Sequence, residues 1–368
     1  MRKLFSICAV LIPLLALVVA AGFVFEHNIS ARAAATCTPT GFVRDAMDLT
    51  AAVIDPPGTF SGTLDATGCN IGVYYSPGAK GTINNAEIFG ANYFGVVNNG
   101  GHVTITKSSI HDIGEKPFNG AQHGVAIYFA DASRATGSIT NNYITKYQKG
   151  GIVTNGVGTN ATITHNIVIG LGPVDFIAQN GIEVGDGAKA TVNNNTVTDN
   201  SYTGPGGASS GGILVFGGAC YGSALTVGTN ITNNIVLSND VGVFLSNLDA
   251  SCAPTTTPTK ILTQDNFIRN DAVNNTSGFG PGAGYQAGVS DQGDYDKIIN
   301  NKICGVGYTP VATPPPYLYM IDVTATNHPI VHGNTSCSKS GKGDSSVQPQ
   351  TTATQHLKAA VVARRFYK

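Results

Sequence analysis

The sequence predicts an all-β chain that folds as a single-stranded right-handed parallel β-helix, a solenoid of about nine to ten coils. Three observations predict it: two short markers that alternate along the chain, apolar residues that are β-branched and periodic, and cysteines whose spacing agrees with the repeat. Only 12% of the residues are charged, whereas 42% are hydrophobic and 46 are glycine. This composition supplies ample core, so the body is expected to be folded rather than disordered.

The first marker is a glycine followed by a short β-branched or aromatic run. Its copies are Gly72, Gly95, Gly124, Gly151, Gly181, Gly212, Gly242 and Gly288. Such a marker is expected when each coil contributes one short strand and stacks on the next coil about 4.8 Å away. The shortest coil has 23 residues and no six-residue period is present, which favours the right-handed form over a left-handed hexapeptide helix.

The second marker is an asparagine followed two positions later by isoleucine or valine. Its copies are Asn142, Asn166, Asn195, Asn234, Asn266 and Asn301, with weaker equivalents at Ala86 and Ser108. Asparagine suits a tight turn because it tolerates the left-handed region, and its amide can bond to the amide of the next coil. The apolar residue two positions later points into the core by the period of two in strands.

Asparagine stacks of this kind occur in the pectate-lyase-like right-handed β-helices, and the chain resembles that superfamily over roughly residues 40–337. No specific enzyme family is matched. The Asp-Asp pair and the Gly-His-Gly of polygalacturonases are missing, and Asp55-Pro56-Pro57 falls short of the Asp-Pro-His of mannuronan epimerases. Arginine is scarce in the body, which weakens an arginine-base pectate lyase. A β-sandwich or another Asn/Gly-rich repeat array is the alternative fold.

The cysteines test the repeat independently. Cys8 lies in the apolar leader, and the remaining even number in an exported chain indicates disulfides. Two pairs occupy equivalent places in adjacent coils: one follows Asn301 and the further candidate rung Asn334 by three residues each, and the other follows two Gly markers. The third pair follows by elimination. The predicted bridges are Cys37–Cys69, Cys220–Cys252 and Cys304–Cys337.

Three segments follow from composition: a signal peptide over 1–35, the β-helix over 36–338 and a flexible basic tail over 339–368. The basic start, the apolar run and the small-residue exit predict cleavage near Ala33 or Ala35, with an uncleaved anchor as the alternative. The mature protein is therefore expected to be secreted and extracellular, with no membrane span after cleavage.

Charge restricts the partners. Residues 36–338 carry 12 Lys and Arg against 20 Asp and Glu, a net charge of −8, whereas the last thirty residues carry +5. An acidic body excludes nucleic acid as the expected partner. It also argues against polyanionic sugars unless Ca²⁺ bridges the like charges. No cofactor is evident, Ca²⁺ is a candidate, and the chain is expected to be a monomer that binds a polysaccharide or a cell-surface glycan.

Four coils carry insertions at the same corner, at residues 113–122, 170–179, 199–210 and 270–286. The first two loops look like copies of each other, and the coil between them has no insertion. Loops above and below such a gap would wall a cleft, and function is often carried by such loops. Its floor would be made by outward residues of the Gly-marked strands, including Ala126, Val153 and Glu183.

This corner gathers the densest set of reactive side chains. The catalytic candidates are Glu183, Glu115, His123, Lys149 and Asp112, and the substrate-binding candidates are Gln122, Lys146, Asp175, Gln179 and Tyr202. Paired carboxylates serve in glycoside cleavage, and a Lys or His base serves a lyase or epimerase. Tyr128, Tyr147 and Tyr202 could stack on sugar rings. The competing interpretation places these charges on a solvated face and turns His123 inward.

Two functions from different classes fit these features. The first is a secreted protein that recognises a polysaccharide and cleaves it as a hydrolase or lyase. The second is a non-catalytic adhesin, or a glycan-binding or structural solenoid, so the sequence leaves open whether the protein is an enzyme. A third interpretation, ice or mineral binding through a Thr-rich face, is the least favoured because regular Thr-x-Thr rungs are not evident.

Overall fold

The computed structural model describes residues 36–130, 134–278, 283–324, 327–337 and 347–349. The predicted signal peptide and the predicted tail lie outside these ranges, apart from residues 347–349. Among the described residues, no helix has the length and apolar character needed to cross a membrane.

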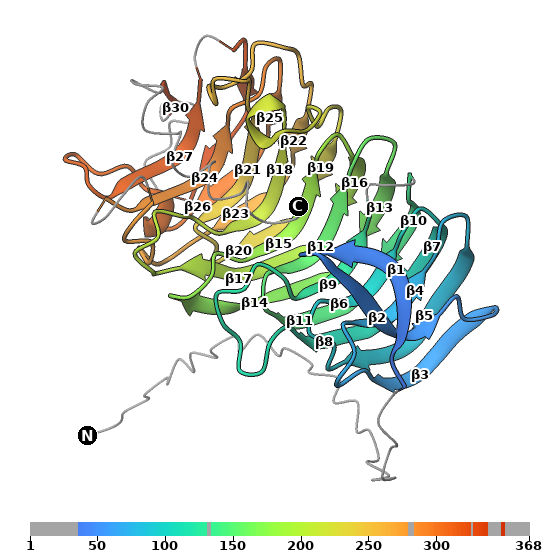
Figure 1. The fold of residues 1–368 in the computed structure, drawn as a ribbon. Coiled ribbons are helices and arrows are strands. Elements are labelled where there is room, and N and C mark those ends of the chain that lie inside the picture. Colours follow the sequence, from blue (N-terminus) through green and yellow to red (C-terminus); the bar gives the residue numbers. More distant parts are fainter. Residues whose placement is uncertain (1–35, 131–133, 279–282, 325–326, 338–346, 350–368) are drawn as a thin grey trace, which may run out of the picture. The chain divides into compact units, whose positions relative to one another are not determined.

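One sheet, called sheet A, takes one strand from each coil (Figure 1). Its parallel strands are β2 (Met47–Ile54), β4 (Ile71–Tyr75), β6 (Phe94–Asn98), β9 (Val125–Phe129), β12 (Gly150–Asn155), β15 (Asn180–Gly185), β18 (Gly211–Gly217), β21 (Val241–Asn247), β24 (Tyr285–Asp291), β27 (Tyr317–Val323) and β30 (Val347–Pro349). At one end, β1 (Thr38–Arg44) pairs with β2 and is antiparallel. Successive coils thus add one parallel strand each, as the repeat predicts.

The other sheet, called sheet B, takes two short strands from most coils and so forms two rows. It begins with β3 (Thr59–Asp65) and β5 (Lys80–Phe89). The first row continues with β7 (His102–Thr106), β10 (Thr136–Thr140), β13 (Asn160–Thr164), β16 (Lys189–Asn193), β19 (Asn230–Thr232), β22 (Leu262–Gln264), β25 (Lys297–Ile299) and β28 (Ile330–His332). The second row contains β8 (Ser109–Ile113), β11 (Tyr143–Tyr147), β14 (Ile167–Val174), β17 (Thr196–Tyr202), β20 (Ile235–Leu237), β23 (Phe267–Arg269), β26 (Lys302–Cys304) and β29 (Thr335–Ser336).

The predicted asparagine ladder separates the two rows of sheet B. Each side-chain amide donates to the amide oxygen of the next coil, from Asn142 to Asn166 at 2.9 Å and onward to Asn334. The residue before each asparagine has a positive φ, for example 57° at His165 and 56° at Asn194. The left-handed residue of the turn is thus the one before the marker and not the marker asparagine, which corrects that part of the prediction. The predicted ladder of amides is confirmed.

The glycine marker reflects close packing between the sheets. A Cβ at Gly151 would lie 2.5 Å from the carbonyl oxygen of Gly181 and 2.5 Å from Val168 of sheet B. One predicted copy is wrong, because strand register aligns Ala126, not Gly124, with Gly95 and Gly151. Gly124 instead occupies a turn with φ of 90°.

All three predicted disulfides are present. The Cα–Cα distances are 5.3 Å for Cys37–Cys69, 4.8 Å for Cys220–Cys252 and 5.1 Å for Cys304–Cys337. These distances lie within the range that a disulfide requires. Each bridge joins neighbouring coils, so the cysteine spacing and the coil register agree.

Candidate functional site

The described residues of the four inserted loops lie at one corner, where the second row of sheet B leads into sheet A, as predicted. Residues 279–282 of the fourth loop lie outside the described residues. The first two loops are in contact, since a Cβ at Gly120 would lie 3.1 Å from the carbonyl oxygen of Phe176. The side chain of Gln148 fills the space behind the first loop: it accepts from the backbone N–H of Glu115 at 3.1 Å and donates to the carbonyl of Ala121 at 2.7 Å. The open gap that was predicted between these loops is therefore absent.

The outer face of sheet A carries one side chain per coil on its central column. The column runs through Tyr74, Val97, Tyr128, Val153, Glu183, Leu214, Phe244, Ser290 and Asp322. Val153 and Glu183 face outward as predicted, but Ala126 does not: it lies in the core between the sheets. The prediction for Ala126 is wrong because the marker position of this coil is Ala126 itself, two residues after Gly124. The outward residue lies two positions after the marker and is therefore Tyr128.

Glu183 and Lys149 form a buried charged pair on this face, and both were predicted as catalytic residues. Each is only 1% exposed. Glu183 accepts a hydrogen bond of 2.9 Å from the amide of Asn180, and the Lys149 ammonium donates to the carbonyl of Ala178 at 2.6 Å. Burial raises the pKa of Glu183 and lowers the pKa of Lys149, while the charge of each opposes the shift of the other.

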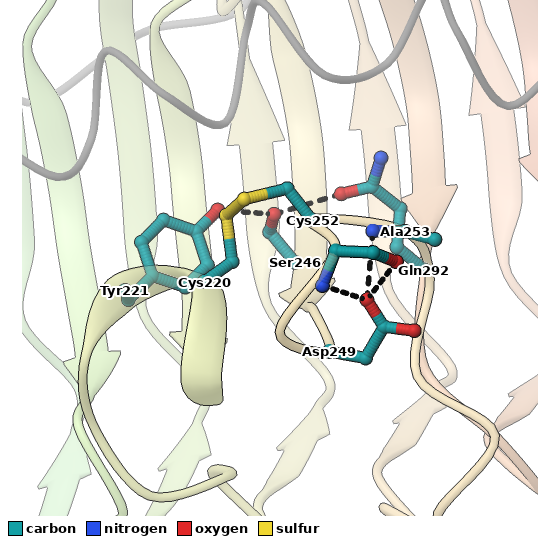
Figure 2. Close-up of a disulfide and its surroundings, with 8 residues drawn as sticks. Cys220, Tyr221, Ser246, Asp249, Cys252, Ala253 and Gln292 are labelled. Atoms are coloured by element: carbon teal, nitrogen blue, oxygen red, sulfur yellow. Dashed lines mark hydrogen bonds between the residues drawn. A yellow bond between two sulfur atoms is a disulfide. The ribbon is translucent and has the colours of Figure 1, made fainter.

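A chain of hydroxyl and amide groups continues along the same face (Figure 2). Tyr221, in the short 3-10 turn η2 (Ala219–Tyr221), shares a 2.7 Å hydrogen bond with Ser246, whose hydroxyl donates to Gln292 at 2.7 Å. The Cys220–Cys252 disulfide fixes this turn beside the sheet. Burial raises the pKa of Tyr221, and the charges of Asp186 and Glu183 raise it further. These groups were not predicted from the sequence, although Cys220 marked the loop that carries Tyr221.

Glu115 and His123 form a second pair, joined by a 2.7 Å contact between the carboxylate and Nε2. The imidazole stacks on Tyr93 with ring centroids 3.8 Å apart. The amide of Asn92 also lies 3.4 Å from the Glu115 carboxylate. This pair is therefore built on coils closer to the N-terminus, and His123 is half-buried at the surface rather than turned into the core.

Asp112 belongs to a third group, on the outer surface of sheet B. Its carboxylate lies 2.6 Å from Nδ1 of His111 and 3.5 Å from the ammonium of Lys146, whose side chain is 60% exposed. His111 also contacts Glu87 at 3.3 Å. Exposed ion pairs of this kind contribute little to stability. The five predicted catalytic residues thus fall into three groups instead of one cleft.

The predicted substrate-binding residues mostly hold the loops in place. Gln179 is fully buried and donates to the carbonyl of Tyr147 at 2.6 Å, and the Gln122 amide donates to Gly120 at 2.9 Å. Tyr202 is 7% exposed, and its hydroxyl accepts from Gly206 at 3.0 Å. These contacts arise because the backbone of an inserted loop needs hydrogen-bond partners. Of this set, only Asp175 and Lys146 are exposed.

The predicted sugar-stacking tyrosines are also enclosed. Tyr147 lies in the core between the sheets, where its hydroxyl donates to Asn200 at 2.6 Å. Tyr128 faces outward but is covered by β1, since Arg44 lies 3.2 Å from its hydroxyl and Phe42 packs against its ring. None of the three predicted tyrosines therefore presents an open ring face to a sugar.

Within the described ranges, no group of three or more His, Cys, Asp or Glu side chains is arranged to hold a metal ion. Bridging of a substrate by Ca²⁺ stays a prediction, since such an ion would take part of its ligands from the substrate.

Comparison with known proteins supports the fold. Residues 59–222 match the family model described as right handed beta helix region, which confirms the predicted fold class and handedness. No curated protein sequence matches the chain. Among solved structures, the Dettilon tailspike protein (gp208) is similar, with 15% identity and a TM-score of 0.48 over 78% of this chain and 55% of the tailspike chain. This chain thus corresponds to about 55% of the tailspike's length, and so low a similarity carries no conclusion about function.

Proposed function

We propose that the protein is secreted and that it recognises and cleaves an extracellular polysaccharide at the outer face of sheet A, with Glu183 and Lys149 as the acid–base pair. Because both groups are buried, binding of the substrate has to displace the residues that cover them. The observation that carries this proposal is the burial of both charges: Glu183 lies on a column whose neighbouring members, Val153 and Leu214, are apolar, and Lys149 lies buried near it. Burying an ion pair seldom stabilises a fold more than apolar residues of the same volume would. Perturbed, buried acids and bases are concentrated at functional sites.

The two shifts suit the two roles in cleavage. Burial raises the pKa of Glu183 to about 7, so near neutral pH a fraction of the molecules carries the proton that can be donated to the leaving glycosidic oxygen. An amine whose pKa is lowered has a neutral fraction that can accept a proton, from water in hydrolysis or from the sugar carbon next to a carboxylate in β-elimination. One oxygen of Glu183, Oε1, has no hydrogen-bond partner within the described part of the chain.

Supporting features come from the surrounding fold. Three disulfides are typical of proteins that function outside the cell. The hydroxyl and amide groups of Tyr221, Ser246 and Gln292 extend the polar strip beside Glu183. Such groups are suited to sugar hydroxyls, which both donate and accept hydrogen bonds.

The test is a panel of neutral and acidic polysaccharides, with and without Ca²⁺, assayed for new reducing ends and for the ultraviolet absorbance of unsaturated uronates. Reducing ends alone identify hydrolysis, and both signals together identify a lyase. Glu183→Gln should lower the rate by about 10²- to 10⁴-fold, the usual contribution of a general acid. Asp265→Asn, which removes an exposed carboxylate in a turn outside the inserted loops, is the matched control and should keep the wild-type rate.

Two outcomes would contradict the proposal. One is full activity in a Glu183→Gln protein whose melting temperature matches the wild type. The other is a wild-type protein that binds one of these polysaccharides but cleaves none of them. The second result would identify a non-catalytic glycan-binding solenoid, a function that also fits the many loop residues with purely structural contacts.

A further inference from the structure

The outer face of the first row of sheet B forms a regular array of hydroxyl and amide groups, here called the hydroxyl face. Two adjacent outward columns make it: Thr82, Thr104, Ser138, Thr162 and Thr191, and Asn84, Thr106, Thr140, Thr164 and Asn193. Among these strands only β7 and β13 carry Thr-x-Thr rungs, and the Ser-x-Thr rung of β10 lies between them. Regular Thr-x-Thr rungs are therefore lacking here, as expected, but hydroxyl and amide groups recur in every coil of the face.

The hydroxyl groups of this face are held in fixed positions. Ser138 donates to Thr104 at 3.3 Å, and Thr140 donates to Thr106 at 3.2 Å. β-Branched side chains have few χ1 rotamers, and the strands repeat about every 4.8 Å. A partner therefore meets a preorganised grid and does not have to order it on binding.

A depression of about 320 Å³ lies in the middle of the hydroxyl face. Its lining includes His102, Thr104, Thr136, Ser138, Asn160 and Thr162. Strand β10 contributes Ser138 to the lining, and this residue is smaller than its counterparts Thr104 and Thr162 in the neighbouring coils. The volume lies at the lower end of the range of about 300–1,000 Å³ that is usual for small-molecule sites.

The lining carries almost no charge. His102 is its one titratable side chain, and Nδ1 of this residue contacts the hydroxyl of Thr136 at 3.0 Å. A third outward column contains His102, Thr136 and Asn160, and Lys80 and Lys189 lie at its two ends, beyond the depression. Hydroxyl and amide groups without a charged partner favour a ligand that is rich in hydroxyls and uncharged.

We infer that the hydroxyl face is a second carbohydrate-binding site, which takes an uncharged polysaccharide and seats a sugar ring in the depression at Ser138. The chain would run across β7, β10 and β13, where the same groups recur in each coil. This site does not depend on the reaction proposed at Glu183, because it lies on the other sheet. The competing partner is the surface of an ice crystal, which requires a flat binding face on the protein. The depression interrupts such a flat face.

The experiment measures depletion of the full secreted protein by microcrystalline cellulose, chitin and amylose resin. The wild type should be retained on at least one of them. Ser138→Arg fills the depression with a charged side chain and should weaken retention by about tenfold or more, equivalent to roughly 1.4 kcal/mol. Thr196→Arg, which faces outward on the second row of sheet B and lies outside the hydroxyl face, is the matched control and should be retained like the wild type.

Glu183→Gln separates this site from the proposed catalytic site. It should abolish cleavage and leave retention intact. If retention depends on Glu183 and not on Ser138, binding belongs to sheet A and the inference is wrong, while the proposed reaction stands. Absence of retention on all three probes, or ice shaping that Ser138→Arg abolishes, would also overturn it. Equal melting temperatures of the two arginine variants exclude misfolding as the cause.

Discussion

The outer faces of the two sheets differ although both obey the same period of two. Every residue of β9 (Val125–Phe129) is buried, whereas β7 (His102–Thr106) alternates between exposed or half-exposed and buried positions. Sheet A therefore has two covered faces, while sheet B has one face toward the core and one toward solvent. This is the usual contrast between a strand covered on both sides and one that is half-exposed.

The contrast separates two kinds of chemistry. A charge on sheet A loses its hydration, so the proton affinities of Glu183 and Lys149 shift toward each other. On sheet B the outward hydroxyls keep their access to solvent and can exchange water for a sugar. The covered face is thus suited to proton transfer, and the exposed face to binding without chemistry.

The largest expected effect comes from breaking the buried pair. Lys149→Met leaves the Glu183 carboxylate without its opposite charge, which should lower the free energy of unfolding by about 3–5 kcal/mol in urea titrations. The double variant Lys149→Met/Glu183→Gln should regain most of this stability, because no buried charge is left. It should remain inactive, because it lacks the proposed acid–base pair. Lys146→Met, on the exposed surface of sheet B, should change stability by less than about 1 kcal/mol. If Lys146→Met and Lys149→Met lowered the free energy of unfolding equally, the outer faces of sheets A and B would not differ in the way described.

The next effect is on pH dependence. Burial raises the pKa of Asp240 from an ordinary value of 3.8 to about 7, and hydrogen bonds from Ser210 and Ser201 only partly oppose it. Because the folded pKa lies above the unfolded one, the native state binds the proton more tightly. The contribution of protonated Asp240 to stability is complete below the pKa that this group has in the unfolded chain. It is lost as pH rises through the pKa in the folded protein.

Urea unfolding between pH 4 and 7 measures this loss, which should approach about 1.4 kcal/mol per pH unit at most for a single such group. Asp240→Asn should flatten the slope over that interval. The exposed Asp175→Asn serves as the control and should keep the wild-type slope. A slope that Asp240→Asn leaves unchanged would show that Asp240 does not retain its proton in the folded state.

The sequence predicted what depends on residues at fixed spacing. The asparagine ladder, the disulfides and the inserted corner all repeat with the coil, so each copy supported the others. The Gly marker failed at one coil because a glycine that permits φ of 90°, as at Gly124, looks the same as one required by close packing, as at Gly151. That two-residue error exchanged Ala126 and Tyr128 between the core and the outer face.

The contents of the candidate site were harder to predict because they depend on which backbone groups the loops leave without partners. Gln179 resembled a sugar ligand in sequence, but it satisfies the backbone of its own loop and of the preceding coil. Tyr221 reaches the outer face of sheet A only because the disulfide at Cys220 fixes its turn there. Nothing in the local pattern around either residue carries that information.

The smallest of these effects concerns the ladder that both rows of sheet B share. Asn195 donates to Asn234 at 3.0 Å and to the carbonyl of Ile163 at 2.9 Å, and it accepts from Asn166. Asn195→Ala leaves these buried groups without partners, so the free energy of unfolding should fall by about 1–3 kcal/mol. Asn194→Gly, at the exposed preceding position with φ of 56°, is the matched control and should change it by a few tenths at most.

Both ladder variants should keep full polysaccharide cleavage, because the amide stack lies between the two rows of sheet B and does not reach Glu183. Loss of cleavage in Asn195→Ala at a temperature where it is fully folded would mean that the coil register is transmitted to sheet A. In that case the two faces could not be treated as independent, and the variants at Ser138 and Glu183 would have to be interpreted together.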